Sequence, residues 1–89
     1  MNPPTAGQLW LIRSADPTER RRAVAIRSRE RDAWTVLDAT GHNLTVVPDV
    51  DAVALRPVPG YPVPVEATWD ERVRLLAGFA RPPVLAAAP

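Results

Sequence analysis

The feature that most constrains how this chain folds is a series of short apolar runs separated by turn residues. The runs cover residues 8–14, 22–28, 33–39, 44–48 and 53–57 of an 89-residue chain. Short strands that recur every roughly 8–12 residues are typical of an all-β sandwich or small barrel. The chain is also short for two independent hydrophobic cores. We therefore expect one mainly β domain with short appendages.

Alternation within the second run predicts which of its side chains face the core. The two sets are Val24 and Ile26 on one face of the strand, and Ala23, Ala25 and Arg27 on the other. Because side chains alternate along a strand, we expect the first set to face the core and the second set, with Arg27, to face solvent. The large side chains of Trp10 and Trp34 are expected to fill the core rather than to offer a stacking surface.

Turn residues join the runs in the order of a known class of small barrel. Asp16-Pro17 closes the first run, Gly41 suits a turn with positive φ, and "DVDA" (49–52) predicts one tight helical turn. Four strands, a helical turn and a fifth strand resemble the SH3-like or Sm-like small barrel. The resemblance implies a five-stranded barrel over residues 8–57. A β-meander packed on a terminal helix would use the same strands.

A proline-rich strap and one helix are predicted after the strands, between an N-terminal arm (1–7) and a flexible tail (82–89). The strap, residues 58–67, holds three of the eleven prolines, which favours extended backbone. It is expected to lie along its own domain, the alternative being a ligand for an aromatic groove. "TWDE" (68–71) fits a capping box and predicts a helix over 68–81.

The predicted helix has an apolar face that must pack against something. Its candidate docking residues are Trp69, Val73, Leu76 and Phe79. A helix of about three turns is marginal alone in water, so this face either closes the protein's own barrel or binds a partner. If Trp69 is buried in the protein's own core, replacing it with alanine should cost about 3–5 kcal/mol.

Arginine is concentrated in the first third of the chain and acidic residues in the middle. Residues 13–31 hold seven arginines against three acidic residues, whereas residues 32–71 hold seven acidic residues against one arginine. Arginines that flank a strand near a tryptophan can contact phosphates while a base stacks on the indole. The candidate residues for binding nucleic acid or an acidic partner are Arg20, Arg21, Arg22, Arg27, Arg29 and Arg31.

The sequence carries no signature of catalysis or of metal binding. It has no cysteine, and its single histidine, His42, lies in a predicted turn without a second histidine nearby. The four glycines do not cluster into a phosphate-binding loop. We therefore predict a protein that is not an enzyme and binds no metal or small-molecule cofactor. No apolar run reaches the roughly 18 residues that span a bilayer, so we expect no membrane partner and a cytoplasmic location.

One stretch resembles the opening of the MazF/PemK-type toxin endoribonucleases, which are small SH3-like barrels. "GQLWLIRSADPTERRRAVAIRS" (7–28) shares with them a Gly-x-x-aromatic strand, Gly7 to Trp10, and an arginine pair, Arg21-Arg22. The resemblance implies that one of these two arginines stands where the family has its catalytic arginine. Ala23 replaces the family's proline, and no strand-end Pro-Leu-Thr or Pro-Leu-Ser element follows.

These observations favour a non-enzymatic binding or adaptor module whose basic edge contacts nucleic acid. One alternative is a structural or assembly protein of a phage or mobile element, which self-associates or docks on a protein partner through complementary charges. Another is a degenerate toxin-like ribonuclease. Self-association in the absence of nucleic acid would distinguish the assembly protein from the nucleic-acid-binding module.

Overall fold

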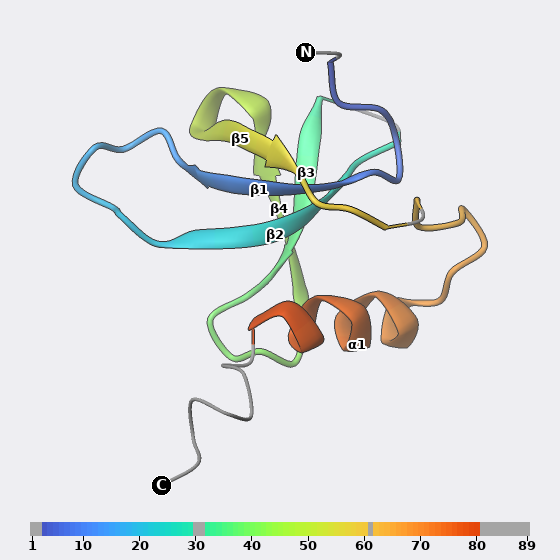
Figure 1. Ribbon diagram of the computed structural model, residues 1–89. Helices are drawn as coiled ribbons and strands as arrows, with labels where there is room; N and C mark the ends of the chain where they lie inside the picture. The colour runs from blue at the N-terminus through green and yellow to red at the C-terminus, as the bar shows by residue number, and fades with distance from the viewer. Residues whose placement is uncertain (1–2, 30–31, 61, 81–89) are drawn as a thin grey trace, which may run out of the picture.

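The computed structural model describes residues 3–29, 32–60 and 62–80. These form five strands, one 3₁₀ turn and one α-helix (Figure 1): β1 (Leu9–Ser14), β2 (Arg22–Arg27), β3 (Ala33–Leu37), β4 (Leu44–Pro48), η1 (Asp49–Asp51), β5 (Ala52–Pro57) and α1 (Trp69–Ala80). The prediction of a mainly β fold with one C-terminal helix is confirmed. The helix of the described part is not long and apolar enough to cross a membrane.

The strands form one antiparallel sheet in the order β4-β3-β2-β1-β5. The predicted closure into a barrel is wrong, because within the described residues β4 pairs only with β3 and β5 only with β1. Strands β4 and β5 lie at opposite edges of the sheet, and the turn η1 connects them. Each also ends in a proline, Pro48 and Pro57, which has no N–H to donate to a further strand.

Two tryptophans dominate the core on one face of the sheet. This tryptophan cluster consists of Trp10, Ile12, Ala25, Trp34 and Val36. The rings of Trp10 and Trp34 meet edge to face with their centroids 6.3 Å apart, an arrangement that aromatic pairs prefer. Ala25 lies directly opposite Trp10 in the β1–β2 ladder and is fully buried. The predicted core position of both tryptophans is confirmed.

The orientation predicted for Ala25 is therefore wrong. Its face of β2 is not the solvated one, because the indoles of Trp10 and Trp34 occupy that side of the sheet and leave room for a small side chain only. The other face of β2 is also buried, as predicted, with Ile26 6% exposed and Val24 half-buried. When both faces of a strand are buried, the alternation of side chains in its sequence does not show which face is the more deeply buried.

The second face of the sheet is covered by α1, which lies against β2 and β3 (Figure 1). Leu9, Ile26 and Leu76 form a cluster there, with Val58 and Val63 packed against it. The amide of Glu71 donates to Oγ1 of Thr68 over 3.1 Å, so the predicted N-terminal cap of the helix is present. The helix is thus held by one deeply buried leucine and a defined start.

The segment that joins β5 to α1 is fixed to β1 and to Gly7, which lies two residues before it. The amide of Val58 donates to the carbonyl of Leu9 over 2.9 Å, and that of Val63 donates to the carbonyl of Gly7 over 2.7 Å. Gly7 has a φ of 81°, and a Cβ at this position would lie 2.7 Å from the Val63 carbonyl oxygen. Only glycine therefore allows this close approach of the two segments.

Candidate nucleic-acid interface

The three consecutive arginines lie together at the start of β2. Arg20 and Arg21 end the loop between β1 and β2, and Arg22 is the first residue of the strand. All three are exposed. The loop is shaped by Asp16, whose carboxylate accepts from the amide and the hydroxyl of Thr18. An aspartate in such a turn holds the loop without help from the core.

Arg21 is partly neutralised by a neighbour. Its Nε and one terminal nitrogen donate to the two carboxylate oxygens of Glu19 over 3.0 and 2.9 Å. The side-chain hydrogen bond from Arg21 is the main reason that the pKa of Glu19 is lowered to about 2. Glu19 is therefore ionised at neutral pH. The paired arginine offers a ligand less net charge than the sequence indicates.

Arg27 does not face solvent, contrary to the prediction. Its side chain is only 12% exposed, and its guanidinium lies 4.7 Å from the centre of the Trp34 ring. One terminal nitrogen donates to Oδ1 of Asp49 over 2.9 Å, and the other lies 3.4 Å from Asp32. Trp34 Nε1 donates to the same Oδ1 over 3.1 Å. The charge of Arg27 is thus used within the fold.

The carboxylate that joins these groups is held in its ionised form. The hydrogen bond from Arg27 is the main reason that the pKa of Asp49 is lowered, and the hydrogen bond from Trp34 acts in the same direction. Asp49 therefore ties the end of β4 to the side chains of β2 and β3. Arg27 is therefore not part of the candidate interface.

The remaining predicted arginines lie elsewhere or outside the described residues. Arg29 is exposed and follows the other end of β2. The six residues of β2 span about 20 Å, so Arg29 is well separated from Arg22. Arg31 lies outside the described residues. The five predicted arginines within the described residues do not converge on one surface.

The strand register adds two arginines that the sequence analysis missed. Arg13 lies directly opposite Arg22 in the β1–β2 ladder, and Arg56 of β5 lies opposite Leu11. Because paired residues share a face, Arg13, Arg22 and Arg56 lie on the same side of the sheet. None of the three takes part in an ion pair within the described residues. We call Arg13, Arg20, Arg22 and Arg56 the basic edge.

The register could not be inferred from charge clustering along the chain. Arg13 and Arg56 each stand alone among apolar residues, and they come together only because β5 returns to β1. The sequence offered one signal, the alternation of the first run. Arg13 is two residues from Leu11 and four from Leu9, so the three side chains are expected on the same face of the strand.

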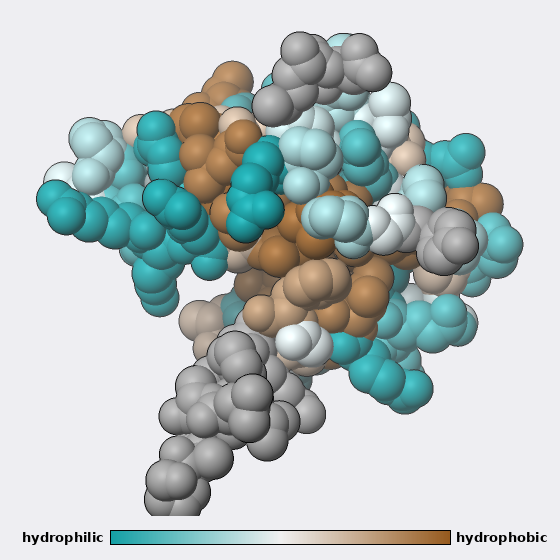
Figure 2. Space-filling model, in the orientation of Figure 1, coloured by the Kyte–Doolittle hydropathy of each residue, from teal (hydrophilic) through white to brown (hydrophobic). Residues whose placement is uncertain are grey.

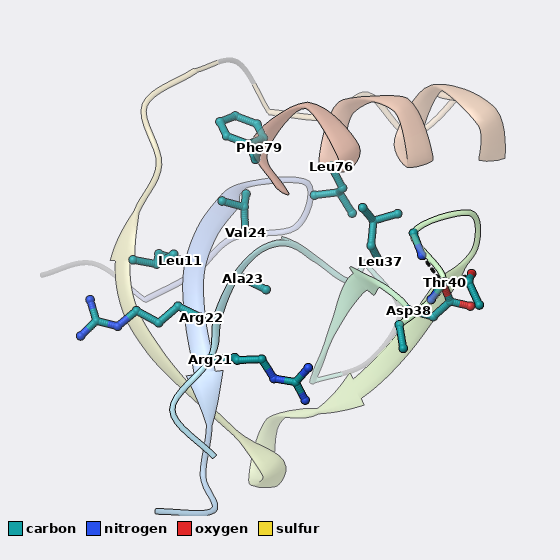
Figure 3. A pocket seen from close by; sticks show the side chains of 12 residues that line it. Leu11, Arg21, Arg22, Ala23, Val24, Leu37, Asp38, Thr40, Leu76 and Phe79 are labelled. Carbon is teal, nitrogen blue, oxygen red and sulfur yellow. Dashed lines mark hydrogen bonds between the residues drawn. The ribbon is translucent and has the colours of Figure 1, made fainter. Parts of the chain in front are cut away.

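A groove lies beside the basic edge, between the C-terminal half of α1 and the sheet. It measures about 640 Å³. In Figure 3, Leu76 and Phe79 project from the helix toward Val24 and Leu37, and these side chains form an apolar floor. Arg21 and Arg22 lie at one rim of the groove, and Asp38 with the turn that follows it lies at another.

The hydrophobic surface of this region is visible in Figure 2. It lies above α1, in the middle of the face shown, and hydrophilic side chains flank it on the side of the β1–β2 loop.

Comparisons of the chain with models of protein families, with curated proteins and with solved structures found no match. The geometry of the molecule is therefore the basis for proposing a function.

The four predicted docking residues of α1 differ widely in burial. Leu76 is 2% exposed and Val73 is half-buried. Trp69 and Phe79 are 54% and 45% exposed. The helix therefore packs on its own sheet through Leu76, and the structure does not bury Trp69 in the core.

Within the described residues, no group of three or more His, Cys, Asp or Glu side chains could hold a metal ion. His42 is exposed, and its amide donates to the hydroxyl of Thr40. The carboxylate of Asp38 accepts from the hydroxyl of Thr40 over 2.6 Å and from two amides, and the hydroxyl is the main reason that its pKa is lowered. The polar groups of this hairpin turn are used to shape it.

Proposed function

We propose that the protein is a small, non-enzymatic binding module whose basic edge contacts nucleic acid. The observation that carries the proposal is the pair Arg13 and Arg22, two like charges directly opposite each other in the sheet. Like charges in such a position destabilise a sheet. A phosphate group between the two guanidinium groups would replace this repulsion with two charge-assisted hydrogen bonds.

The surroundings support an anionic ligand at this edge. Arg20 is exposed at the end of the β1–β2 loop, and Arg56 lies two strands away from Arg22, on the other side of β1. A row of arginines on neighbouring strands matches a chain of phosphates better than it matches a single anion. The buried tryptophans are not available for base stacking, so the proposed contact is mainly with the backbone.

We also propose that the open sheet is of the SH3-like type. The supporting features are the strand order, the 3₁₀ turn η1 between β4 and β5, and the return of β5 to β1. This assignment concerns the fold alone, because one small fold can carry many unrelated functions. The proposed ligand depends on the arginines of the basic edge.

The test is binding of labelled single-stranded and duplex oligonucleotides at two salt concentrations. Binding should weaken with salt, with a log–log slope of about −0.7 to −0.9 per phosphate neutralised. Arg13→Gln and Arg22→Gln should each flatten that slope by about one unit. Arg74→Gln is a matched control, since Arg74 is exposed on α1 and outside the basic edge. An absence of binding at low salt, or an equal effect of the control, would overturn the proposal.

A further inference from the structure

A separate pocket lies beside the C-terminal end of β2, on the face of the sheet that α1 covers. Its floor is a row of side chains across three strands, because Ile26 of β2 lies opposite Thr35 of β3, and Thr35 lies opposite Val46 of β4. Val63 and Val65, in the segment before α1, also line it. The pocket measures about 370 Å³, which is within the range of small-molecule sites.

The charged side chains available at this pocket are of one sign. Arg29 is exposed, and Arg72 of α1 is half-buried and donates to the carbonyl of Val65 over 3.1 Å, which fixes its side chain beside the pocket. Neither arginine forms an ion pair with the described residues. Arg27 also lines the pocket, but its guanidinium is used in the ion pairs described above. No aspartate or glutamate is among the described residues of the lining.

One hydroxyl group is available on the apolar floor. Thr35 is half-buried, and its Oγ1 forms no hydrogen bond with the other described residues. A pocket that is mainly apolar, with a few polar groups that fix the orientation of a ligand, is the usual form of a small-molecule site. The polar groups here are one hydroxyl and two guanidinium groups, and they select a ligand with an anionic end.

We propose that this pocket binds a small organic acid, an apolar molecule that carries one carboxylate. The apolar part would cover Ile26 and Val46, and the carboxylate would accept hydrogen bonds from Arg72 and Arg29. Pairs of arginine and carboxylate are among the stronger polar contacts in proteins, because the bonds are charge-assisted. A polyphosphate would bring more charge than two arginines offset. The groove beside the basic edge is different, because Asp38 lies at its rim together with the arginines.

This proposal does not depend on the proposed binding of nucleic acid. None of the arginines of the basic edge lines this pocket. Loss of oligonucleotide binding and loss of acid binding are therefore separate results, and they are measured with different variants.

The test is an NMR titration of the isotope-labelled full chain with two matched pairs of compounds, octanoate with octanol and benzoate with benzyl alcohol. Each alcohol has the apolar part of its acid without the charge. At least one acid should shift the signals of Ile26, Thr35 and Val46, and it should bind at least about tenfold more tightly than its alcohol. The proposal is wrong if neither acid shifts these signals, or if each acid binds no more tightly than its alcohol.

Two substitutions of valine by aspartate locate the binding. Val46→Asp adds a carboxylate to the floor at a position that is 51% exposed, and it should raise the dissociation constant of the acid at least about tenfold. Val50→Asp makes the same change in η1, at a position that is 83% exposed and outside the pocket, and should leave the constant unchanged. Equal effects of the two changes would overturn the proposal.

A second pair of variants tests the charge without altering the floor. Arg29→Gln should weaken binding of the acid about two- to fivefold and leave binding of its alcohol unchanged. Arg74→Gln, at an exposed position of α1 outside the pocket, should change neither. Because Arg29 is exposed, this pair decides the question even if Val46→Asp disturbs β4. Binding of the acid that Arg29→Gln leaves unchanged would contradict the proposed contact with the carboxylate.

Discussion

The guanidinium of Arg27 lies over the indole of Trp34, 4.7 Å from the ring centre, and both side chains donate to the same oxygen of Asp49. A residue that the sequence analysis assigned to a ligand-binding surface is therefore part of the structure that holds three strand ends together.

Replacing Arg27 with methionine should lower the free energy of unfolding by about 1–3 kcal/mol. The change removes a hydrogen bond between charged groups and a cation–π contact at a largely buried position. Arg56→Met, at an exposed position of β5, should change it by less than about 0.5 kcal/mol. Urea denaturation of the two variants checks this, and equal losses would contradict the internal role of Arg27.

The contribution of Asp49 should depend on pH. Its pKa is lowered from 3.8 in the folded protein, mainly by the hydrogen bond from Arg27. Because the folded pKa lies below the unfolded one, the contribution is complete above about pH 3.8 and is lost as the pH falls through the folded value. Asp49→Asn should thus be less stable than the wild type at about pH 7, and the difference should shrink at about pH 2.5. A difference that is the same at both pH values would contradict this.

The burial of Leu76 and the exposure of Trp69 predict opposite sensitivities. Leu76→Ala should lower the free energy of unfolding by about 2–5 kcal/mol, because it leaves a cavity between α1 and the sheet. Trp69→Ala should cost much less than the 3–5 kcal/mol or so expected of a buried tryptophan. Urea denaturation measures both, and a larger loss for Trp69→Ala would show that this side chain belongs to the core.

Removing the carboxylate beside Arg21 should strengthen binding to nucleic acid. Glu19→Gln leaves the guanidinium without its ion-pair partner, so affinity at low salt should rise about two- to fivefold. Glu66→Gln makes the same change at the start of α1 and should have a smaller effect. The oligonucleotide assay described above measures both, and an unchanged affinity for Glu19→Gln would contradict a contact at the end of the β1–β2 loop, where Glu19 lies between Thr18 and Arg20.

The purified protein should not cleave RNA. The arginine that would stand in the catalytic position, Arg21 or Arg22, is not accompanied by a Pro-Leu-Thr or Pro-Leu-Ser element, and Arg21 is paired with Glu19. Incubation with a long single-stranded RNA, followed by gel electrophoresis, tests this. Specific cleavage that is lost in Arg21→Ala or Arg22→Ala would support the toxin-like alternative instead.

The order and type of the elements could be predicted from the sequence, because local signals encode them. Alternating apolar residues, Gly41 and the Thr68 cap each act over a few residues, and Gly41 has the expected positive φ of 75°. The ion pair that Arg27 forms within the fold could not be predicted, since its partner Asp49 is 22 residues away. The same holds for the basic edge, because the register that places Arg13 opposite Arg22 depends on the whole ladder.

The two edges of the sheet, which are unpaired within the described part of the chain, have a consequence for how the protein behaves when it is crowded. An edge strand is a template on which the strands of neighbouring molecules can grow into aggregates. Here β4 ends at Pro48 and β5 ends at Pro57, and β5 also carries an irregularity opposite Leu11 and Ile12. Prolines and irregular pairing interrupt such growth. We therefore expect the features at the two edges of the sheet to limit its polymerisation as well.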